Sequence, residues 1–315
     1  TVSVFIRRLK FMPKIPHDII IGCGVAAAIS AGFGAPLAGL IFAHETVLRH
    51  FSMKAITALA VSSMAANFFA SEINLVTPFL LLPEIPFAIS DVLPSLAIIG
   101  PIAAIVAVIF MKLIIFLGTL PPKFKIKNWQ SPVIAGLFCG LFGMFFDEVL
   151  GLGTNTVMMV ITSNQDTSYL LALLVGKLLL SCICLGFGFF GGTFSPALFL
   201  GAIVGALVFQ LPLTSMNIDF LSILAVSGMA AVSSSVIGAP ITAIILVLEL
   251  TGSYEYAIAA TFPIVVCSFI TSRVFGTSLF DKQLISRGIA ITKGREQIIL
   301  NEVLIEEYAD KQYTK

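Results

Sequence analysis

Long apolar stretches separated by short polar segments run through the whole chain and predict a series of membrane-spanning helices. A helix needs about 20 predominantly apolar residues to cross a bilayer core. The clearest apolar runs are Ser95–Leu117, Ser131–Phe146, Tyr169–Phe190, Phe194–Leu211, and Ala239–Leu250 continuing through Ala257–Ile270. A secretory signal would be one short apolar stretch at the start. The pattern therefore predicts an all-α polytopic membrane protein.

Glycine and proline interrupt the apolar runs at unusual places, among them Gly32–Pro36, Gly191–Pro196 and Gly238–Pro240. In lipid, such breaks leave backbone groups unpaired at a cost of several kcal/mol each, unless they are buried in protein or line a cavity. Interrupted helices of this kind are typical of channels and secondary transporters. We therefore expect a bundle of tilted and interrupted helices around an internal site.

Two segments of the chain repeat each other. Val25–Thr46 reads VAAAISAGFGAPLAGLIFAHET and Met229–Leu250 reads MAAVSSSVIGAPITAIILVLEL, with a constant offset of 204 residues (229 − 25). Eight positions are identical, and both copies carry GAP followed nine residues later by a glutamate, Glu45 or Glu249. Two copies of one membrane module predict an inverted or a parallel repeat with a site between the copies.

The first copy of the repeat is expected to be truncated and the second complete. Pro240 follows Pro196 by 44 residues (240 − 196), whereas the same distance before Pro36 falls before Thr1. We interpret the chain as a fragment, or as a product missing its beginning. A full-length protein with a diverged first repeat is the alternative.

Composition agrees with a membrane location. The 315 residues are 58% hydrophobic and 11% charged, with a mean hydropathy of +1.04, whereas a soluble domain carries about 25% charged residues. Two clusters of basic residues are present: Lys123, Lys125 and Lys127, and then Lys282, Arg287, Lys293 and Arg295. The segment Ser71–Asp91 has neither Lys nor Arg. Because cytoplasmic loops are enriched in Lys and Arg, both clusters and the C-terminus are expected in the cytoplasm.

The sequence offers no pattern typical of an enzyme or a metalloprotein. The five cysteines lie in apolar segments without metal or disulfide spacing. The three histidines, His17, His44 and His50, lie at segment ends without a partner serine or metal-binding pattern. We therefore predict that the protein is not an enzyme, holds no metal or cofactor, and binds no nucleic acid.

The motif GGTFSP, at Gly191–Pro196, precedes an apolar helix and is the strongest candidate for chemistry. Two glycines allow a sharp turn and close approach to a ligand, and proline suits the first helical turn. A helix N-terminus inside the membrane binds anions through free N–H groups and its positive dipole end. A site without full charge also lets the ion leave. A tight packing turn between helices is the alternative.

Several of these segments resemble the CLC family of chloride channels and chloride/proton antiporters. GGTFSPALFLGA is similar to the family signature GxFxP, and both repeat segments resemble the corresponding family segments in order and spacing. Lys177 lies where the family commonly has a basic residue before the signature. The resemblance implies a CLC-like helical bundle, a homodimer with a separate anion pathway in each subunit, and chloride or a similar small anion as substrate.

The resemblance also implies the residues of the anion site: Gly192, Thr193, Phe194, Ser195, Pro196 and Phe280. The N–H groups of Thr193 and Phe194 are expected to contact the anion. The family usually has a tyrosine where this chain has Phe280, and phenylalanine has no hydroxyl to donate. The family's early serine loop and its GxEGP motif are not visible and would precede Thr1. Without them the chain is not expected to form a complete pore.

Glu45 and Thr46 form the candidate proton pathway. Family exchangers generally carry an acid at the inner end of this helix, and Thr46 takes that position. Threonine does not titrate, so the sequence favours an anion channel, with a chloride/proton antiporter as the alternative. A one-residue slip would return Glu45 to the relay, and a structural carboxylate is the other interpretation of Glu45. A secondary transporter of another substrate and a non-conducting fragment rank lower.

The chain is expected to divide into two parts. Residues 1–290 form the CLC-like transmembrane domain. Residues 291–315 form a polar cytoplasmic tail that resembles the linker leading to CBS domains in longer family members, although an ordinary charged tail fits equally well.

Overall fold

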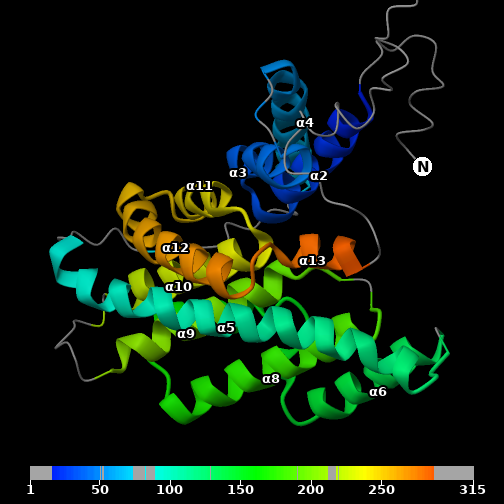
Figure 1. Cartoon of the computed structure of the whole chain (residues 1–315). Coiled ribbons are helices and arrows are strands. Elements are labelled where there is room, and N and C mark those ends of the chain that lie inside the picture. Colours follow the sequence, from blue (N-terminus) through cyan, green and yellow to red (C-terminus); the bar gives the residue numbers. More distant parts are fainter. Residues whose placement is uncertain are drawn as a thin grey trace, which may run out of the picture.

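The computed structural model describes residues 16–286 except 50, 52, 74–81, 83–88, 128, 190, 212–217 and 219, and these residues form helices without a strand (Figure 1). The elements are α2 (His17–Phe33), α3 (Pro36–Phe42), the π-helical turn η1 (Ala43–Leu48), α4 (Met53–Glu72), α5 (Ile89–Lys123), α6 (Gln130–Gly143), the 3-10 turn η2 (Asp147–Val149), α7 (Thr154–Thr162), α8 (Thr167–Gly186), α9 (Phe194–Phe209), α10 (Phe220–Ile237), α11 (Pro240–Thr251), α12 (Tyr254–Val274) and α13 (Leu279–Ser286). The predicted all-α fold is confirmed. The predicted tail, 291–315, lies outside the described residues.

The centre of the molecule is the contact between α9 and α10. Of the 18 residues of α10, 17 are buried, and 11 of the 16 residues of α9 are buried. Glycines make the close approach: a Cβ added at Gly201 would lie 2.3 Å from the Gly228 carbonyl oxygen, and one at Gly205 would lie 2.0 Å from that of Leu224. Small residues of this kind let membrane helices pack backbone to backbone. The packing fixes the start of α9 inside the protein.

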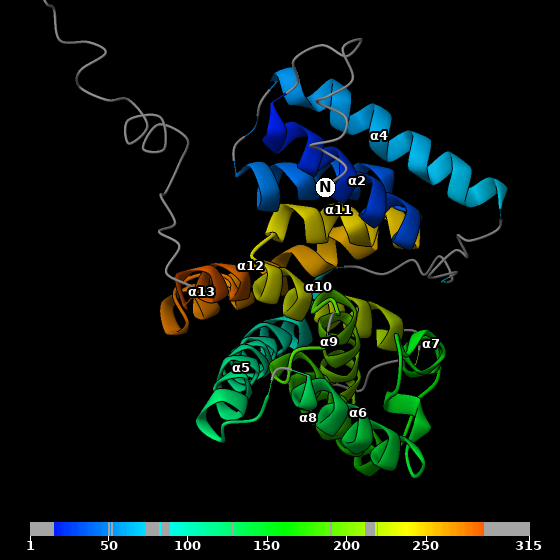
Figure 2. The same cartoon turned by 90° about the vertical axis from the view of Figure 1, so that its right-hand side faces the viewer.

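The remaining helices surround this centre in two groups. Figure 2 shows α2, α3 and α4 gathered on one side, next to α11, with α6 and α8 on the opposite side of the molecule. The long helix α5 packs on α10 and α12. Its 35 residues extend about 50 Å at 1.5 Å per residue. A helix of that length exceeds an average bilayer core of about 30 Å and must tilt or project from it.

Two helices long enough to span a membrane, α4 and α10, do not coincide with any of the clearest apolar runs of the sequence. In α4 and α10, small and polar residues interrupt the hydrophobic pattern, yet both helices are long and apolar enough to span a bilayer. Two serines of α10 are accommodated because their hydroxyls donate to carbonyls of the same helix, Ser233 to Ala230 and Ser234 to Ala231. The run Ala239–Ile270 is divided by Gly252, which has a left-handed φ of 66° and ends α11.

Gly205→Ala should disrupt the α9–α10 contact. The added methyl group would overlap the Leu224 backbone, so we expect the free energy of unfolding to fall by at least about 3 kcal/mol. Gly24→Ala in α2 is the matched control, because nothing lies within 4 Å of its added Cβ. Alanine favours a helix over glycine by about 0.5–1 kcal/mol, so this variant should be neutral or more stable. Apparent Tm values of the detergent-solubilised proteins test this, and equal Tm values would contradict it.

Candidate functional site

The two repeat copies adopt the same backbone at their helix breaks. Gly34 and Gly238 are left-handed, with φ of 66° and 80°. Ala35 follows with φ −123° and ψ 79°, and Ala239 with φ −132° and ψ 72°. In both copies a proline then occupies the first turn of the next helix, where no N–H is required. The sequence repeat is therefore also a repeat of local structure.

The shared spacing from GAP to glutamate places each carboxylate at the start of the equivalent helix in the other copy. Glu45 accepts hydrogen bonds from Ile241 N (3.1 Å) and Thr242 N (2.9 Å), and from the Thr242 hydroxyl (2.7 Å). Glu249 accepts hydrogen bonds from Leu37 N (2.8 Å) and Ala38 N (2.7 Å). These donors lie in the first turns of α11 and α3.

This reciprocal exchange sets the relation between the two copies. The end of each helix meets the start of the other, so α3 with η1 runs antiparallel to α11. An antiparallel pair of equivalent helices is the arrangement of an inverted repeat. Each glutamate offers negative charge to unpaired N–H groups at the positive end of a helix dipole. The N-termini of α3 and α11 are thus occupied by carboxylates of the chain itself.

The structure places the two residues of the candidate proton pathway in different surroundings. The Glu45 carboxylate points to the start of α11, as described above. The Thr46 Oγ1 atom is buried and has no hydrogen-bond partner among the described residues. The structure therefore gives Glu45 a definite contact with Thr242. A proton pathway through Glu45 and Thr46 stays a prediction.

The helix break before α9 differs from the other two. The structure records no acceptor for the N–H groups of Thr193 and Phe194 among the residues it describes, and no carboxylate caps this helix. The Thr193 hydroxyl is also buried and without a partner in the described part of the chain. The Ser195 hydroxyl donates to the Leu152 carbonyl at 3.2 Å. The start of α9 therefore presents donors that the described part of the chain does not use, which is the requirement for binding an anion.

Aromatic side chains from distant segments form an apolar wall beside the start of α9. Phe194 and Phe280 pack against the same small buried cluster, formed by Phe42, Ile237 and Ala239. The rings of Phe33 and Phe194 meet edge to face, with centroids 4.8 Å apart. Phe194 and Phe280 thus share one cluster, and their contact with an anion stays a prediction. The sequence did not point to Phe33, because its place depends on how α2 packs.

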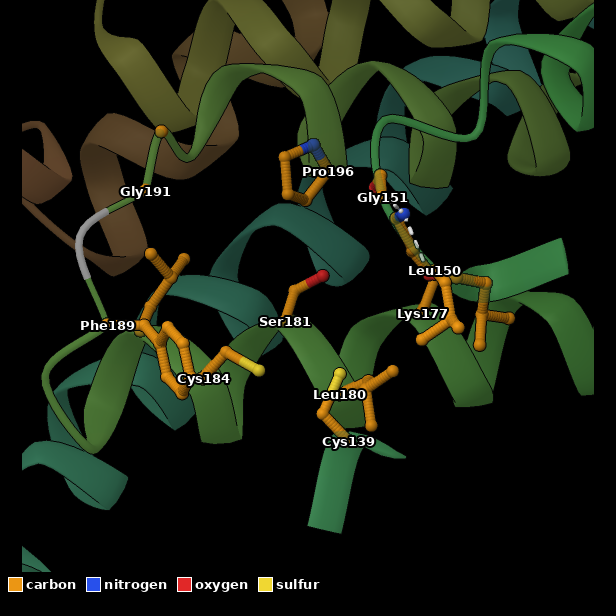
Figure 3. A pocket seen from close by; sticks show the side chains of 13 residues that line it. Cys139, Leu150, Gly151, Lys177, Leu180, Ser181, Cys184, Phe189, Gly191 and Pro196 are labelled. Atoms are coloured by element: carbon orange, nitrogen blue, oxygen red, sulfur yellow. Dashed lines mark hydrogen bonds between the residues drawn. The ribbon is translucent and has the colours of Figure 1, made fainter. Parts of the chain in front are cut away.

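A cavity of about 220 Å³ lies beside the glycines of the GGTFSP motif (Figure 3). Its lining includes Gly191, Gly192 and Pro196 from the motif and Ser181 and Lys177 from α8. Sequence reasoning gave no role to the loop opposite, which supplies Leu150 and Gly151.

Lys177 is the charged group of this cavity. It is 2% exposed, and its Nζ atom donates to the carbonyls of Val149 (2.9 Å) and Gly151 (2.8 Å). The Nζ atom also lies 4.7 Å from the centre of the Phe199 ring. No carboxylate pairs with it among the described residues. Neutral carbonyls and a ring do not cancel the charge, so Lys177 makes the cavity attractive to anions.

Comparisons with known proteins show the family of this chain. A family model described as "Voltage gated chloride channel" matches residues 3–273. The chain is 27% identical over 290 residues to the H(+)/Cl(-) exchange transporter ClcA of Vibrio cholerae serotype O1, covering 88% of this chain and 61% of that protein. It is 30% identical over 250 residues to ClcA of Citrobacter koseri, covering 75% and 52%. The chain thus spans less than two thirds of the length of these relatives.

Solved structures share the fold. A slow cyanobacterial Cl−/H+ antiporter superimposes with a TM-score of 0.72 at 23% identity, covering 86% of this chain and 65% of that chain. A CLC-type fluoride/proton antiporter superimposes with a TM-score of 0.70 at 24% identity, covering 83% and 64%. The CLC-like bundle of interrupted helices that the sequence predicted is confirmed.

Glu45→Ala and Glu249→Ala should each destabilise the protein. Each removes the charged acceptor of at least two backbone N–H groups, so we expect the free energy of unfolding to fall by about 2–3 kcal/mol. Glu255→Ala is the control, because its carboxylate is exposed and its hydrogen bonds are local, with the Ser253 hydroxyl and its own backbone N–H. Apparent Tm values measure the effect. Unchanged Tm values for both Glu45 and Glu249 variants would argue against the reciprocal caps.

Proposed function

This chain belongs to the voltage gated chloride channel family, and we propose that it moves chloride or a similar small anion across a membrane in exchange for protons. The protein is an integral membrane protein with several spanning helices. The proposed substrate pathway passes the start of α9. The residues proposed to contact the anion are Gly192, Thr193, Phe194, Ser195 and Pro196, with Phe280 in the apolar wall.

The observation that carries the proposal is the difference between the three helix breaks. Carboxylates of the chain occupy the N-termini of α3 and α11 through Glu45 and Glu249. The start of α9 keeps its donors at Thr193 and Phe194 without an acceptor in the described residues. Free N–H donors at this half-buried helix start favour an anion from outside the chain.

The buried charge of Lys177 also favours an anion as the ligand of this site. Its buried ammonium group lies at the cavity beside Gly191 and Gly192 without a carboxylate partner in the described chain. A positive potential in a cleft with low-dielectric walls raises the local concentration of anions. The cation is held by carbonyls and a ring, so it attracts an anion without forming a tight direct pair at the motif.

The names of the relatives favour an exchanger over the channel that the sequence predicted. The two relatives compared above are called H(+)/Cl(-) exchange transporters, and both compared structures are antiporters. A channel is the second candidate, and Thr46 is the observation that favours it, because its hydroxyl does not titrate. The exchanger therefore requires a proton route that does not depend on an acid at position 46.

The proposal extends to assembly and orientation. We infer a homodimer with one anion pathway in each subunit, as the family resemblance implies. We also propose that the basic ends near Lys123 and Lys282 face the cytoplasm, in accordance with the excess of Lys and Arg in cytoplasmic loops.

Chloride efflux recorded together with external pH tests the exchange directly. The protein, expressed from its complete gene, is reconstituted into chloride-loaded liposomes. We expect chloride to leave while protons enter in a fixed ratio, so the external pH rises. Chloride efflux without a pH change would identify a channel. No efflux from liposomes that contain the folded protein would contradict anion transport altogether.

Lys177→Met should slow anion transport. Loss of the buried charge removes the positive potential at the cavity, and we expect the efflux rate to fall by about tenfold at low ionic strength. Lys112→Met in α5 is the control, because Lys112 is exposed. The matched measurement is the initial chloride efflux rate at equal protein content. An equal decrease in both variants would show that the effect is not specific to the cavity.

A further inference from the structure

An ion pair joins two parts of the chain that the proposed transport mechanism does not use. Arg49 and Asp281 lie 232 residues apart and pair through a guanidinium nitrogen and a carboxylate oxygen. Arg49 directly follows η1, the turn that holds Glu45 and Thr46. Asp281 lies in the first turn of α13, next to Phe280 of the apolar wall. The pair therefore connects the end of the first repeat copy with the last described helix.

The short helix α13 depends on such contacts for its position. It has eight residues, and a helix of this length is not stable alone in water. Leu279 is fully buried, and the Lys282 ammonium lies 5.5 Å from the centre of the Phe275 ring. These contacts hold α13 to α12 and the core, whereas the Arg49 pair holds it to the first repeat copy.

Two neighbouring residues of α13 reach the same segment of the first copy. Phe280 packs on the cluster that contains Phe42, the last residue of α3. Asp281 pairs with Arg49, just beyond the end of η1. Arg49 has a left-handed φ of 57°, which is uncommon for a residue other than glycine. This conformation directs the chain around the end of η1 at the point where the side chain meets Asp281.

We propose that Arg49 and Asp281 form a latch that holds α13 against the α3–η1 segment and so keeps Phe280 in the wall of the anion site. Both are positioning residues, because they act through Phe280. The consequence for transport rests on the proposed function, whereas the docking of α13 does not. The side chains of Arg49 and Asp281 are 38% and 17% exposed, so dissolved salt can screen the latch.

Thiol accessibility at Leu279 tests the docking without any transport measurement. Leu279→Cys places a thiol at a fully buried position of α13. Its reaction with a water-soluble maleimide is followed by peptide mass, so the native cysteines do not interfere. Arg49→Gln or Asp281→Asn should each raise the rate by about fivefold, the upper range expected for a partly exposed ion pair. Ile285→Cys, on an exposed position of α13, should react equally fast in all backgrounds.

The charge-reversed pair provides the decisive comparison. Arg49→Asp combined with Asp281→Arg should return the Leu279→Cys rate to that of the parent, because the pair is restored with exchanged partners. The combination of Arg49→Gln with Asp281→Asn should raise the thiol reaction rate no further than either single variant does. Two results would overturn the latch. One is a thiol reaction rate that the single variants do not change, and the other is a rate that stays raised in the charge-reversed protein.

Anion efflux from the same set, without the Leu279 change, tests the consequence for Phe280. Arg49→Gln and Asp281→Asn should each alter the initial chloride efflux rate and its dependence on ionic strength. The charge-reversed pair should restore both. Protected thiols in a parent protein that moves no anion would contradict the proposed function and leave the latch standing. Efflux that is unchanged while the Leu279 thiol becomes accessible would overturn the link between the latch and the wall.

Discussion

The exchange of carboxylates between the two repeat copies is the interaction on which the arrangement of the site depends. Glu45 and Glu249 each cap the helix of the other copy, which forces α3 and α11 to run antiparallel. A carboxylate at a helix N-terminus satisfies backbone donors that lipid cannot satisfy. It also excludes any other anion from that helix end. These two reciprocal contacts thus fix the inverted symmetry and close two of the three helix breaks.

The third helix break, at the start of α9, remains available to an anion because a different contact positions it. Glycines on α9 and α10 bring the two backbones together, and this packing carries the start of α9 into the interior. There Thr193 and Phe194 keep unused N–H donors within the described part of the chain. The nearby charge of Lys177 is held by neutral groups. In the proposed mechanism, donors without a full charge hold an anion weakly enough for it to leave, which ion passage requires.

The apolar wall shows how helices far apart in sequence share one small volume. Phe194 of α9 and Phe280 of α13 pack on the cluster at the end of α10, and Phe33 of α2 meets the Phe194 ring. Each is an unremarkable phenylalanine in an apolar chain, and the wall exists because the inverted repeat brings α3 and the end of α10 together. The position of α13 then bears directly on the shape of the wall.

The sequence by itself determined the membrane class, the interrupted helices, the repeat and the GGTFSP motif. These follow from hydrophobic runs and from glycine and proline, whose effects are local to the backbone. It missed α4 and α10 as clear spans, because small and polar residues dilute their hydrophobic pattern. The tertiary structure alone decided which helix N-terminus stays open and what Glu45 contacts. Those outcomes depend on pairs such as Glu45 with Thr242, about 200 residues apart, whose meeting is set by packing and not by any local propensity.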